Sequence, residues 1–510
     1  MRRADPIRVW YLLQTGSALG DTVVWVIAPV YFVRTVGMSP LQLVLVGTFM
    51  ELTVFMFEVP TGIVADVYSR RLSTVIGVLV MGCAIVFVGL VPVAWAVILG
   101  WSVWGFGYTF TSGATDAWLA DEIGVENVRP VYLRSAQLGR VVGLLGIGAS
   151  VALALAGLWL PIVAGGAVFV ALGVALVVLM PETGFRPAPR QATESALRTM
   201  ATTGRTGARL VRRTPVLLLI LGLSASWGAW SEGYDRLGEA HILRDVGLPS
   251  FFGLSFVVWF GVIAAASLLL SLFAARPANR RLEHAERGTV TRFLLALDVV
   301  LIASVVVFGL AGAFWLALVA MLLTNTARSL AMPLYTSWLN QSIEDSTVRA
   351  TIMSITNQAD AVGQWTGGPA IGWIGNAFGI RAALVTGAFL LTPAVALYGR
   401  ALRPAAASRS SRRYRSRSRQ ARRPSRQWGS SGTPFSLRRT EYFGREAGRP
   451  SSSVEIGRTR QPMPAVAKIA SANSAQVQSP AAARCQVPSG RSSSSRVAVA
   501  RWPTYVGEHR

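Results

Sequence analysis

Charged residues are scarce in this 510-residue chain: they make up 15% of the sequence, whereas 52% of it is hydrophobic. A soluble globular protein carries about 25% charged residues, so this chain has too few to cover a water-facing surface of its size. The composition argues against a soluble multidomain enzyme and against a wholly disordered protein. The positive mean hydropathy of +0.45 instead indicates a protein that crosses a lipid bilayer several times.

The sequence also lacks the patterns of common catalytic and metal sites. Its two cysteines, Cys83 and Cys485, lie far apart, and Cys83 falls inside an apolar run, so neither a disulfide framework nor a zinc site is predicted. We find no Gly-x-x-x-x-Gly-Lys-Ser/Thr loop and no nucleophile–base arrangement, which argues against direct use of ATP and against an enzyme. We therefore predict no cofactor and no bound metal.

Lysine is almost missing, since Lys468 is the only one among 49 basic residues, and positive charge is concentrated at one end. Residues 403–510 hold 22 of the 49 basic and 4 of the 25 acidic residues, which gives +18; residues 1–402 hold the other 27 and 21, which gives +6. The chain is thus a nearly balanced apolar body followed by a basic tail.

The apolar body contains twelve runs long enough to cross about 30 Å of hydrocarbon, which takes about 20 helical residues. Six precede and six follow a polar stretch at 181–214, so we predict an all-α polytopic membrane protein. Its predicted parts are an N-terminal six-helix bundle (1–180), a cytoplasmic central loop (181–214), a C-terminal six-helix bundle (215–402) and a disordered Arg/Ser-rich tail (403–510). The twelve runs are 9–33, 41–65, 72–92, 94–118, 135–157, 159–180, 215–240, 252–275, 292–311, 313–338, 353–376 and 380–400.

Arginines predict the orientation of these spans. With the N-terminus in the cytoplasm, twenty arginines in or beside the spans face inward and three face outward, namely Arg34, Arg244 and Arg381. Cytoplasmic loops of membrane proteins carry an excess of Lys and Arg. The prediction is a multi-pass protein of the inner membrane with both termini in the cytoplasm.

The two sets of six spans resemble one another. Asp116–Ile123, near the end of span four, and Thr336–Ile343, near the end of span ten, share a Trp-Leu-x-x-x-Ile pattern at an offset of 220 residues. Nearly the same offset relates Gln137 to Gln358. Parallel six-helix repeats are typical of major facilitator transporters.

The loop between spans two and three reads Gly-Ile-Val-Ala-Asp-Val-Tyr-Ser-Arg-Arg. It resembles the signature loop of the major facilitator superfamily, Gly-x-Leu-Ala-Asp-Arg-x-Gly-Arg-Arg/Lys, although Val67 and Ser69 depart from it. The matching residues are Gly62, Ala65, Asp66, Arg70 and Arg71.

The physical roles expected in this loop follow from its residue types. Gly62 allows helices to approach closely, Asp66 can cap a neighbouring helix, and the arginines can clamp a carboxylate on span four, Asp121 or Glu122. The alternative is an ordinary positively charged cytoplasmic turn.

Further motifs are similar to one branch of that superfamily, the macrolide-efflux-like or drug:proton antiporter-3 type. The resemblance covers residues 8–400 and implies proton-driven export of drugs. Span five departs from the best-known antiporter signature, because it lacks a Gly-Pro pair. The motifs that carry the resemblance are Glu58–Thr61, Ser112–Leu119, Pro181–Thr183 and Glu232–Leu237.

Ionisable residues inside the spans are candidates for function, because each costs about 3 kcal/mol to place at the bilayer centre. Asp21 and Glu51 have no cation nearby in the sequence, and Glu232 lies nearer the outside; we predict these three for proton coupling, with Asp21 first. Two pairs are interpreted as ion pairs of structural or gating type: Asp116 with Arg140, and Asp360 with Arg328. Candidates to line a substrate cavity are Trp227, Trp230, Gln137 and Gln358, with helix packing or lipid contact as the alternative for the tryptophans.

The tail leaves three interpretations open. It is basic and contains no apolar run that could form a core, so it could lie on the anionic inner leaflet or bind RNA. It could also be an out-of-frame translation of GC-rich DNA after residue 402. We expect no nucleic-acid partner.

Together these features predict a monomer that exports small hydrophobic or amphipathic compounds by alternating access, with protons, substrate and the lipid bilayer as partners. The alternatives are a metabolite uptake protein of the same fold and a transport-inactive membrane scaffold or sensor.

Overall fold

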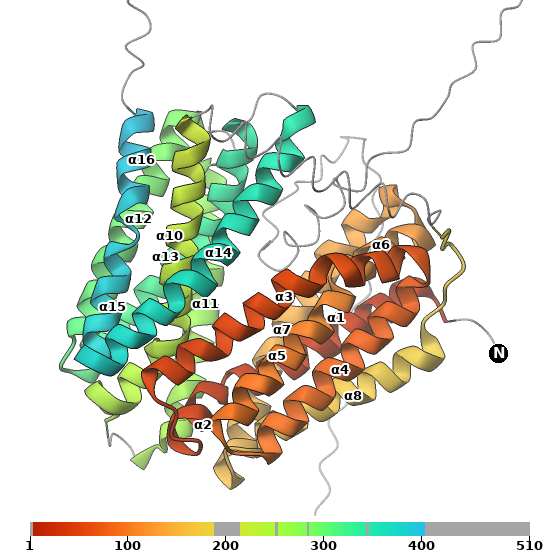
Figure 1. Ribbon diagram of the computed structural model, residues 1–510, viewed down its shortest axis with the longest axis horizontal. Coiled ribbons are helices and arrows are strands. Elements are labelled where there is room, and N and C mark those ends of the chain that lie inside the picture. Colours follow the sequence, from red (N-terminus) through yellow and green to blue (C-terminus); the bar gives the residue numbers. More distant parts are fainter. Residues whose placement is uncertain (1–3, 188–214, 250–252, 283–284, 343–345, 403–510) are drawn as a thin grey trace, which may run out of the picture.

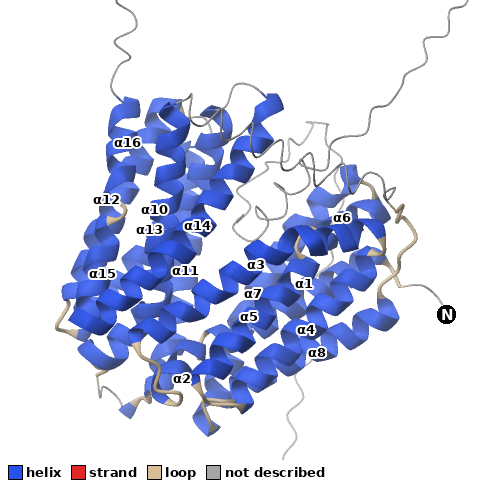
Figure 2. Cartoon of the chain, viewed as in Figure 1, coloured by secondary structure: helices blue, strands red, loops and turns tan. Residues whose placement is uncertain are grey.

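The computed structural model describes residues 4–187, 215–249, 253–282, 285–342 and 346–402. Most of the predicted central loop and the whole predicted tail lie outside the described residues. Within these ranges the chain forms helices joined by short loops, without a strand (Figure 2). The prediction of an all-helical body is confirmed.

Residues before the central loop form eight α-helices and one short 3-10 turn. Asp5 caps the first helix through the Ile7 amide at 3.0 Å, and Ser39 and Gln42 form a capping box at the start of the third. The helix expected over span four is broken at Gly113, whose φ of +71° few other residues adopt. The helices are α1 Pro6–Trp25, α2 Ala28–Arg34, α3 Pro40–Val67, α4 Arg70–Leu90, α5 Ala94–Thr111, α6 Ala114–Ile123, α7 Val128–Ala156 and α8 Leu160–Leu179.

Residues after the central loop form a second set of helices. A π-helical turn at Ile242–Val246 extends the first of them, and Gly379, at φ +92°, lies between the helix that ends at Phe378 and the one that begins at Ile380. They are α10 Pro215–His241, α11 Phe256–Leu282, α12 Arg287–Leu310, α13 Phe314–Ser342, α14 Ser346–Phe378, α15 Ile380–Phe389 and α16 Thr392–Leu402.

Nine helical segments within the described ranges are long and apolar enough to cross a membrane. The three remaining predicted spans coincide with α5, α10 and α14. Two of these helices are less apolar for visible reasons: α10 carries four charged side chains near its end, and α14 is rich in Asn, Gln and Gly. The nine segments are Pro6–Arg34, Pro40–Val67, Arg70–Leu90, Val125–Ala156, Leu160–Leu179, Phe256–Leu282, Gly288–Leu310, Phe314–Asn340 and Ile380–Arg400.

The helices form two groups that follow the order of the chain (Figure 1). In the first, α4 packs on α5 and α8, and α1 packs on α7 and α8; in the second, α10 packs on α14, and α12 packs on α13 and α15. The groups touch mainly where α3 meets α14 and α10, and where α7 meets α11. The molecule therefore has an outer surface and an interface between the two groups of helices.

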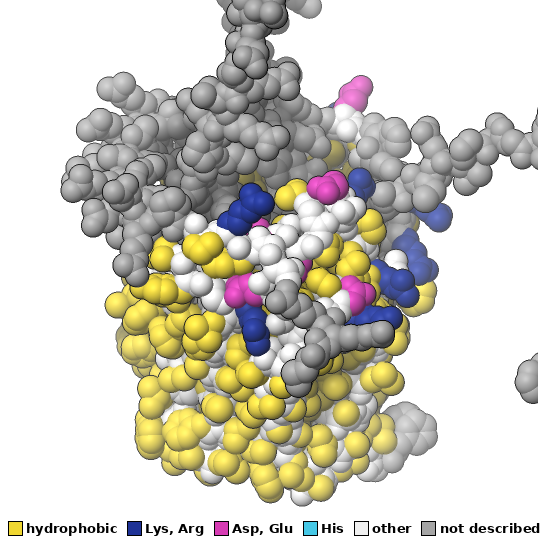
Figure 3. Space-filling model, turned by 90° about the vertical axis from the view of Figure 1, so that its right-hand side faces the viewer, with side chains coloured by type: hydrophobic (Ala, Val, Ile, Leu, Met, Phe, Trp, Pro, Cys, Tyr) yellow, Lys and Arg dark blue, Asp and Glu magenta, His cyan; other side chains and the backbone are white. Residues whose placement is uncertain are grey.

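The outer surface is mostly apolar. Figure 3 shows one face covered by hydrophobic side chains, with charged side chains gathered toward one end. Large apolar residues such as Leu145, Phe273 and Val178 are more than 60% exposed. In water such a surface would be unfavourable, whereas lipid accepts it. The protein is a multi-pass membrane protein.

Contacts between the groups concentrate at the end of the molecule where α2 lies. The Leu41 amide donates to Asn376 Oδ1 at 3.0 Å, and Arg244 donates to the Met38 carbonyl at 2.5 Å. Gly372 of α14 leaves space for Leu41 and Val44, which lie 3.1 Å from where its Cβ would be. The described structure is closed at this end.

Small residues also bring α10 and α14 together within the second group. A Cβ on Gly228 would collide with the backbone carbonyl of Asp360, and one on Gly363 would collide with the backbone of Ala225. Gly363 and Gly228 therefore allow the two helices to pack closely. Helices in membranes associate through such small residues, because lipid supplies no hydrophobic force between them.

We predict that Gly228→Ala destabilises the protein by about 1–3 kcal/mol, because the added methyl group overpacks a fixed backbone. The measurement is the thermal unfolding midpoint in detergent. Gly222→Ala is the matched control on the same helix, since a Cβ there meets nothing within 4 Å and alanine raises helix propensity by up to about 1 kcal/mol. Equal midpoints for the two variants would contradict close packing at Gly228.

Candidate functional site

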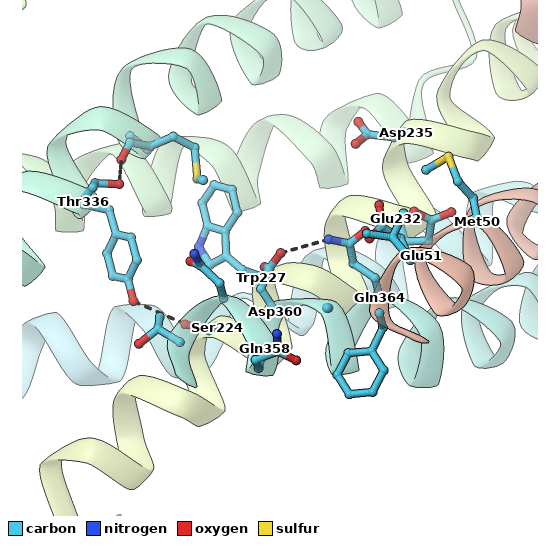
Figure 4. A pocket seen from close by; sticks show the side chains of 18 of the residues that line it. Met50, Glu51, Ser224, Trp227, Glu232, Asp235, Thr336, Gln358, Asp360 and Gln364 are labelled. Atoms are coloured by element: carbon cyan, nitrogen blue, oxygen red, sulfur yellow. Dashed lines mark hydrogen bonds between the residues drawn. The ribbon is translucent and has the colours of Figure 1, made fainter. Parts of the chain in front are cut away.

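A cavity of about 640 Å³ lies between the two groups of helices. The first group lines it with residues of α1, α2, α3 and α5, and the second with residues of α10, α12, α13, α14 and α16. Figure 4 shows polar and aromatic side chains pointing into it from several helices. Its size falls within the range of small-molecule sites, about 300–1,000 Å³.

The first ion pair of the cavity lies on α10 alone. Glu232 Oε1 accepts a hydrogen bond from Arg236 Nε at 2.9 Å, one helical turn away, and the two side chains are 5% and 12% exposed. The guanidinium carbon of Arg236 also lies 5.6 Å from the ring centre of Trp25 on α1. Gly47 of α3 leaves room for the pair, because a Cβ there would overlap the Glu232 carboxylate. The pair thus touches both groups of helices.

The second ion pair joins two helices of the second group. Arg328 of α13 donates two hydrogen bonds to the Asp235 carboxylate, one of them at 2.9 Å, and its guanidinium lies 5.4 Å from the ring centre of Trp230. The sequence-based partner, Asp360, was wrong. Asp360 instead accepts a hydrogen bond from Gln364 at 2.9 Å on its own helix (Figure 4).

The other predicted pair, Asp116 with Arg140, is not among the ion pairs of the described residues. Asp116 lies on α6, which packs on α7. The different partner of Arg328 has a physical cause. Depth in the membrane can be read from sequence, but the direction in which a side chain leaves its helix depends on how the helices pack.

The structure separates the three residues predicted for proton coupling. Glu51 of α3 and Glu232 of α10 line the cavity, and Figure 4 shows them near each other. Asp21 is half-buried on α1 and does not contribute to the cavity lining. Glu232 is already engaged by Arg236, so Glu51 is the cavity carboxylate of these three that forms no ion pair within the described residues.

The predicted cavity residues also divide. Trp227 and Gln358 line the cavity, as expected. Trp230 is 1% exposed, and its ring centre lies 5.6 Å from that of Tyr234. It does not contribute to the cavity lining and packs behind the residues that do. Gln137 of α7 is exposed and lies outside the cavity lining.

Sequence reasoning missed Asp298 of α12, which lines the cavity and is 2% exposed. The available signal was one acidic residue within the apolar run 292–311. It also missed Tyr335, which lines the cavity on α13 and whose hydroxyl lies 3.4 Å from Ser224 Oγ.

The loop that resembles the superfamily signature forms a second polar cluster, away from the cavity. The side chain of Arg70 at the start of α4 is 7% exposed; it pairs with Asp121 of α6 and with Asp66 at 3.2 Å, and it donates to the Ala117 carbonyl at 2.9 Å. This is the arginine–carboxylate clamp expected between the loop and span four. It joins the ends of α3, α4 and α6.

Two neighbours of this cluster have clear structural roles. Glu182 accepts hydrogen bonds from Ser69 Oγ at 2.7 Å and from the Arg71 amide at 3.0 Å, and Glu122 accepts one from the Gly184 amide at 2.8 Å. The segment after α8 is therefore tied to α4 and α6. Gly62 departs from its expected role, because no atom lies within 4 Å of where its Cβ would be.

Within the described residues no group of three or more His, Cys, Asp and Glu side chains could hold a metal ion. The arrangement can enclose a small molecule between two helix groups, with carboxylates, paired arginines and aromatic rings around it.

Comparison with known proteins places this geometry in a family. The sequence matches the Major Facilitator Superfamily over residues 10–363. The chain belongs to that superfamily. The match includes the signature loop, the Arg70 clamp and most of the cavity, and it supports a transporter rather than an enzyme.

Several solved transporter structures share the fold. The nucleoside transporter NupG has 14% identity and a TM-score of 0.63, with 78% of this chain and 98% of that chain covered. A bacterial homologue of the human lysosomal transporter Spinster, in an inward-facing and unoccupied conformation, has 15% identity and a TM-score of 0.59, with 78% and 96% covered. The peptide transporter POT in complex with sulfate has 13% identity and a TM-score of 0.57, with 78% and 95% covered. Comparison with curated protein sequences gave no significant match.

We predict that Glu232→Gln lowers stability by about 3–5 kcal/mol, because it leaves the buried Arg236 charge without its partner. The double variant Glu232→Gln/Arg236→Gln removes both charges and should recover part of that loss. Thermal unfolding of the purified variants in detergent checks this. A double variant less stable than Glu232→Gln would show that the pair is not the reason for the loss.

Proposed function

We propose that this chain exports small hydrophobic or amphipathic compounds across the inner membrane by alternating access, driven by proton influx. The observation that carries the proposal is the 640 Å³ cavity at the interface of two helix groups, with aromatic and apolar walls and several carboxylates. Such walls suit an amphipathic ligand, and intramembrane carboxylates are typical of proton relays. The macrolide-efflux-like branch is the resemblance that favours export.

The proposal includes twelve spans in two six-helix bundles, 1–180 and 215–402, within a monomer. The helices α5, α10 and α14 have 18, 27 and 33 residues, and at 1.5 Å per residue each is at least about 27 Å long. Each packs among helices apolar enough to span. Their polar faces then point toward the cavity rather than toward lipid.

Orientation of the spans follows from the arginines. The three expected outside lie at the closed end of the molecule: Arg244 bonds to the Met38 carbonyl at 2.5 Å, Arg381 to the Asp245 carbonyl at 3.2 Å, and Arg34 stacks 5.8 Å from the Phe256 ring centre. The signature cluster and the end of α16 lie at the opposite end (Figure 1). We propose that the closed end faces outward and that the cavity is reached from the cytoplasm.

Topology can be tested with reporter fusions. Fusions after Arg34 and Arg244 should report the outside, and fusions after Arg129, Arg198 and Arg287 should report the cytoplasm, because basic loops are retained inside. Paired reporters, one active only on each side, give the readout. An outside signal from residue 198 would contradict the arrangement of two six-helix bundles.

Proton coupling is proposed for the carboxylates of the cavity interface, with Asp21, Glu51 and Glu232 as the candidates. Cavity lining and the lack of an ion pair favour Glu51, while Glu232 is held by Arg236. Glu51 is one turn from Gly47, which packs against the Glu232–Arg236 pair. A proton on Glu51 would therefore change the charge beside that pair.

We predict that Glu51→Gln abolishes export driven by a pH gradient and leaves substrate binding measurable, because glutamine keeps the shape but cannot carry the proton. The assay is accumulation of a fluorescent amphipathic compound in cells with and without the gene, each with and without a proton uncoupler. Asp21→Asn, outside the cavity lining, is compared in parallel. A Glu51→Gln protein that still exports and still stops when uncoupler is added would transfer the role to Asp21 or Glu232.

The same assay also reports the direction of transport. Higher accumulation in cells that carry the gene would indicate the alternative, uptake of a metabolite by the same fold. If accumulation is the same with and without the gene in every condition, the result would favour the alternative of a transport-inactive membrane scaffold or sensor.

A further inference from the structure

The walls of the cavity are strongly unbalanced in charge. Seven acidic side chains line it, against one basic side chain, Arg236. Arg236 is paired with Glu232, and Arg328 pairs with Asp235. Five carboxyl groups remain outside the ion pairs of the described residues: Glu51, Glu58, Glu239, Asp298 and Asp360.

Two of the five have polar partners within the protein. Asp360 accepts a hydrogen bond from Gln364 at 2.9 Å, and Glu58 accepts one from Ser112 Oγ at 3.4 Å. Asp298 differs from them. Its residue is 2% exposed, its Oδ2 has no hydrogen-bond partner, and it still contributes to the cavity lining.

A buried carboxylate without a partner is costly, and more so within a membrane, where water is scarce. Removing such a group would normally stabilise a protein, so its presence on a cavity wall points to a partner supplied from the cavity. Leu294, one turn earlier on α12, lines the same wall. Asp298 thus belongs to the cavity face of its helix rather than to the apolar packing behind it.

Aromatic rings surround this part of the cavity. Tyr335 of α13 and Tyr398 of α16 line the same cavity as Asp298, and both of these helices pack on α12, which carries Asp298. Trp338 fixes the two rings from behind: it stacks on Tyr335 at 6.3 Å and packs edge-on against Tyr398 at 5.4 Å. The rings are held in place before any ligand arrives.

A carboxylate beside aromatic rings is suited to an organic cation. The carboxylate supplies charge, the ring faces attract the cation through their quadrupoles, and the rings also bury the apolar groups that surround the charge. An anion would meet five carboxyl groups, and the arginines that could offset them already have partners.

We propose that Asp298, Tyr335 and Tyr398 form a subsite that binds the positively charged centre of a hydrophobic organic cation. The substrates of the transporter are then lipophilic ammonium-like cations rather than neutral or anionic compounds. The inference rests on the proposed function for its biological meaning, but binding can be measured without transport, direction or proton coupling.

The experiment is equilibrium dialysis of the purified full-length protein in detergent against radiolabelled tetraphenylphosphonium. The comparison ligand is triphenylphosphine oxide, which is similar in shape and uncharged. We expect the cation to bind more tightly than the neutral compound, and Asp298→Asn to weaken cation binding by about tenfold or more while changing neutral binding little. Asp298→Glu should keep most of the cation preference.

Two controls separate recognition from folding. Glu126→Gln removes one negative charge from an exposed turn far along the chain from the subsite and should bind as wild type. Asp298→Asn should unfold at the same temperature as wild type or higher, because it removes an unpartnered buried charge. Loss of stability together with loss of both ligands would overturn the proposal, since Asp298 would then be structural.

Other outcomes also decide between the proposals. Equal binding of cation and neutral compound, or unchanged cation binding in Asp298→Asn, would overturn the subsite and leave export untouched. Cation binding that depends on Asp298, in a protein that exports nothing in cells, would support the subsite while contradicting the proposed export function.

Discussion

A charged group inside a membrane needs a partner within the protein, and this requirement organises the centre of the molecule. Water cannot compensate a carboxylate or guanidinium there, so each has to be paired, hydrogen-bonded or directed into a cavity. α10 carries three such groups within five residues, Glu232, Asp235 and Arg236. The Glu232–Arg236 pair lies within α10 and contacts α1 and α3, and Asp235 pairs with Arg328 of α13. These pairs place α10 at the interface of the two helix groups.

The same requirement explains which parts could be predicted. Apolar runs located the helices, with ends that differ by up to seven residues, because lipid contact is a property of whole segments. They did not show the breaks between α1 and α2 or between α5 and α6. The clamp of Arg70 on Asp121 could be expected because a resemblance supplied it. The partner of Arg328 could not be predicted from depth alone, since Asp235 and Asp360 are both within reach of its level and only packing selects one. Asp298 was overlooked because a single carboxylate barely changes the hydropathy of its run.

The helices that hydropathy ranks lowest are the ones nearest the candidate site. α10 and α14 line much of the cavity and also pack on each other through Gly228 and Gly363. Their polar residues lower the hydropathy of each helix, and their glycines weaken its intrinsic helix propensity. A sequence scan therefore gives least support to the spans that matter most for binding, because the properties that make them useful also make them unlike lipid-facing helices.

The closed end and the cavity share the helices α3 and α14, which gives a physical route for coupling between them. α3 meets α14 at Gly372, and one turn or more further along it meets the Glu232–Arg236 pair at Gly47. Opening the closed end would separate α3 from α14 and so remove the surface on which this pair rests. A ligand or proton that changes the charge beside the pair therefore acts on the same contact that holds the end closed. The free energy of binding and the free energy of opening are then linked where α3 lies against α10 and α14, without any need for a signal to travel through the helix bundles.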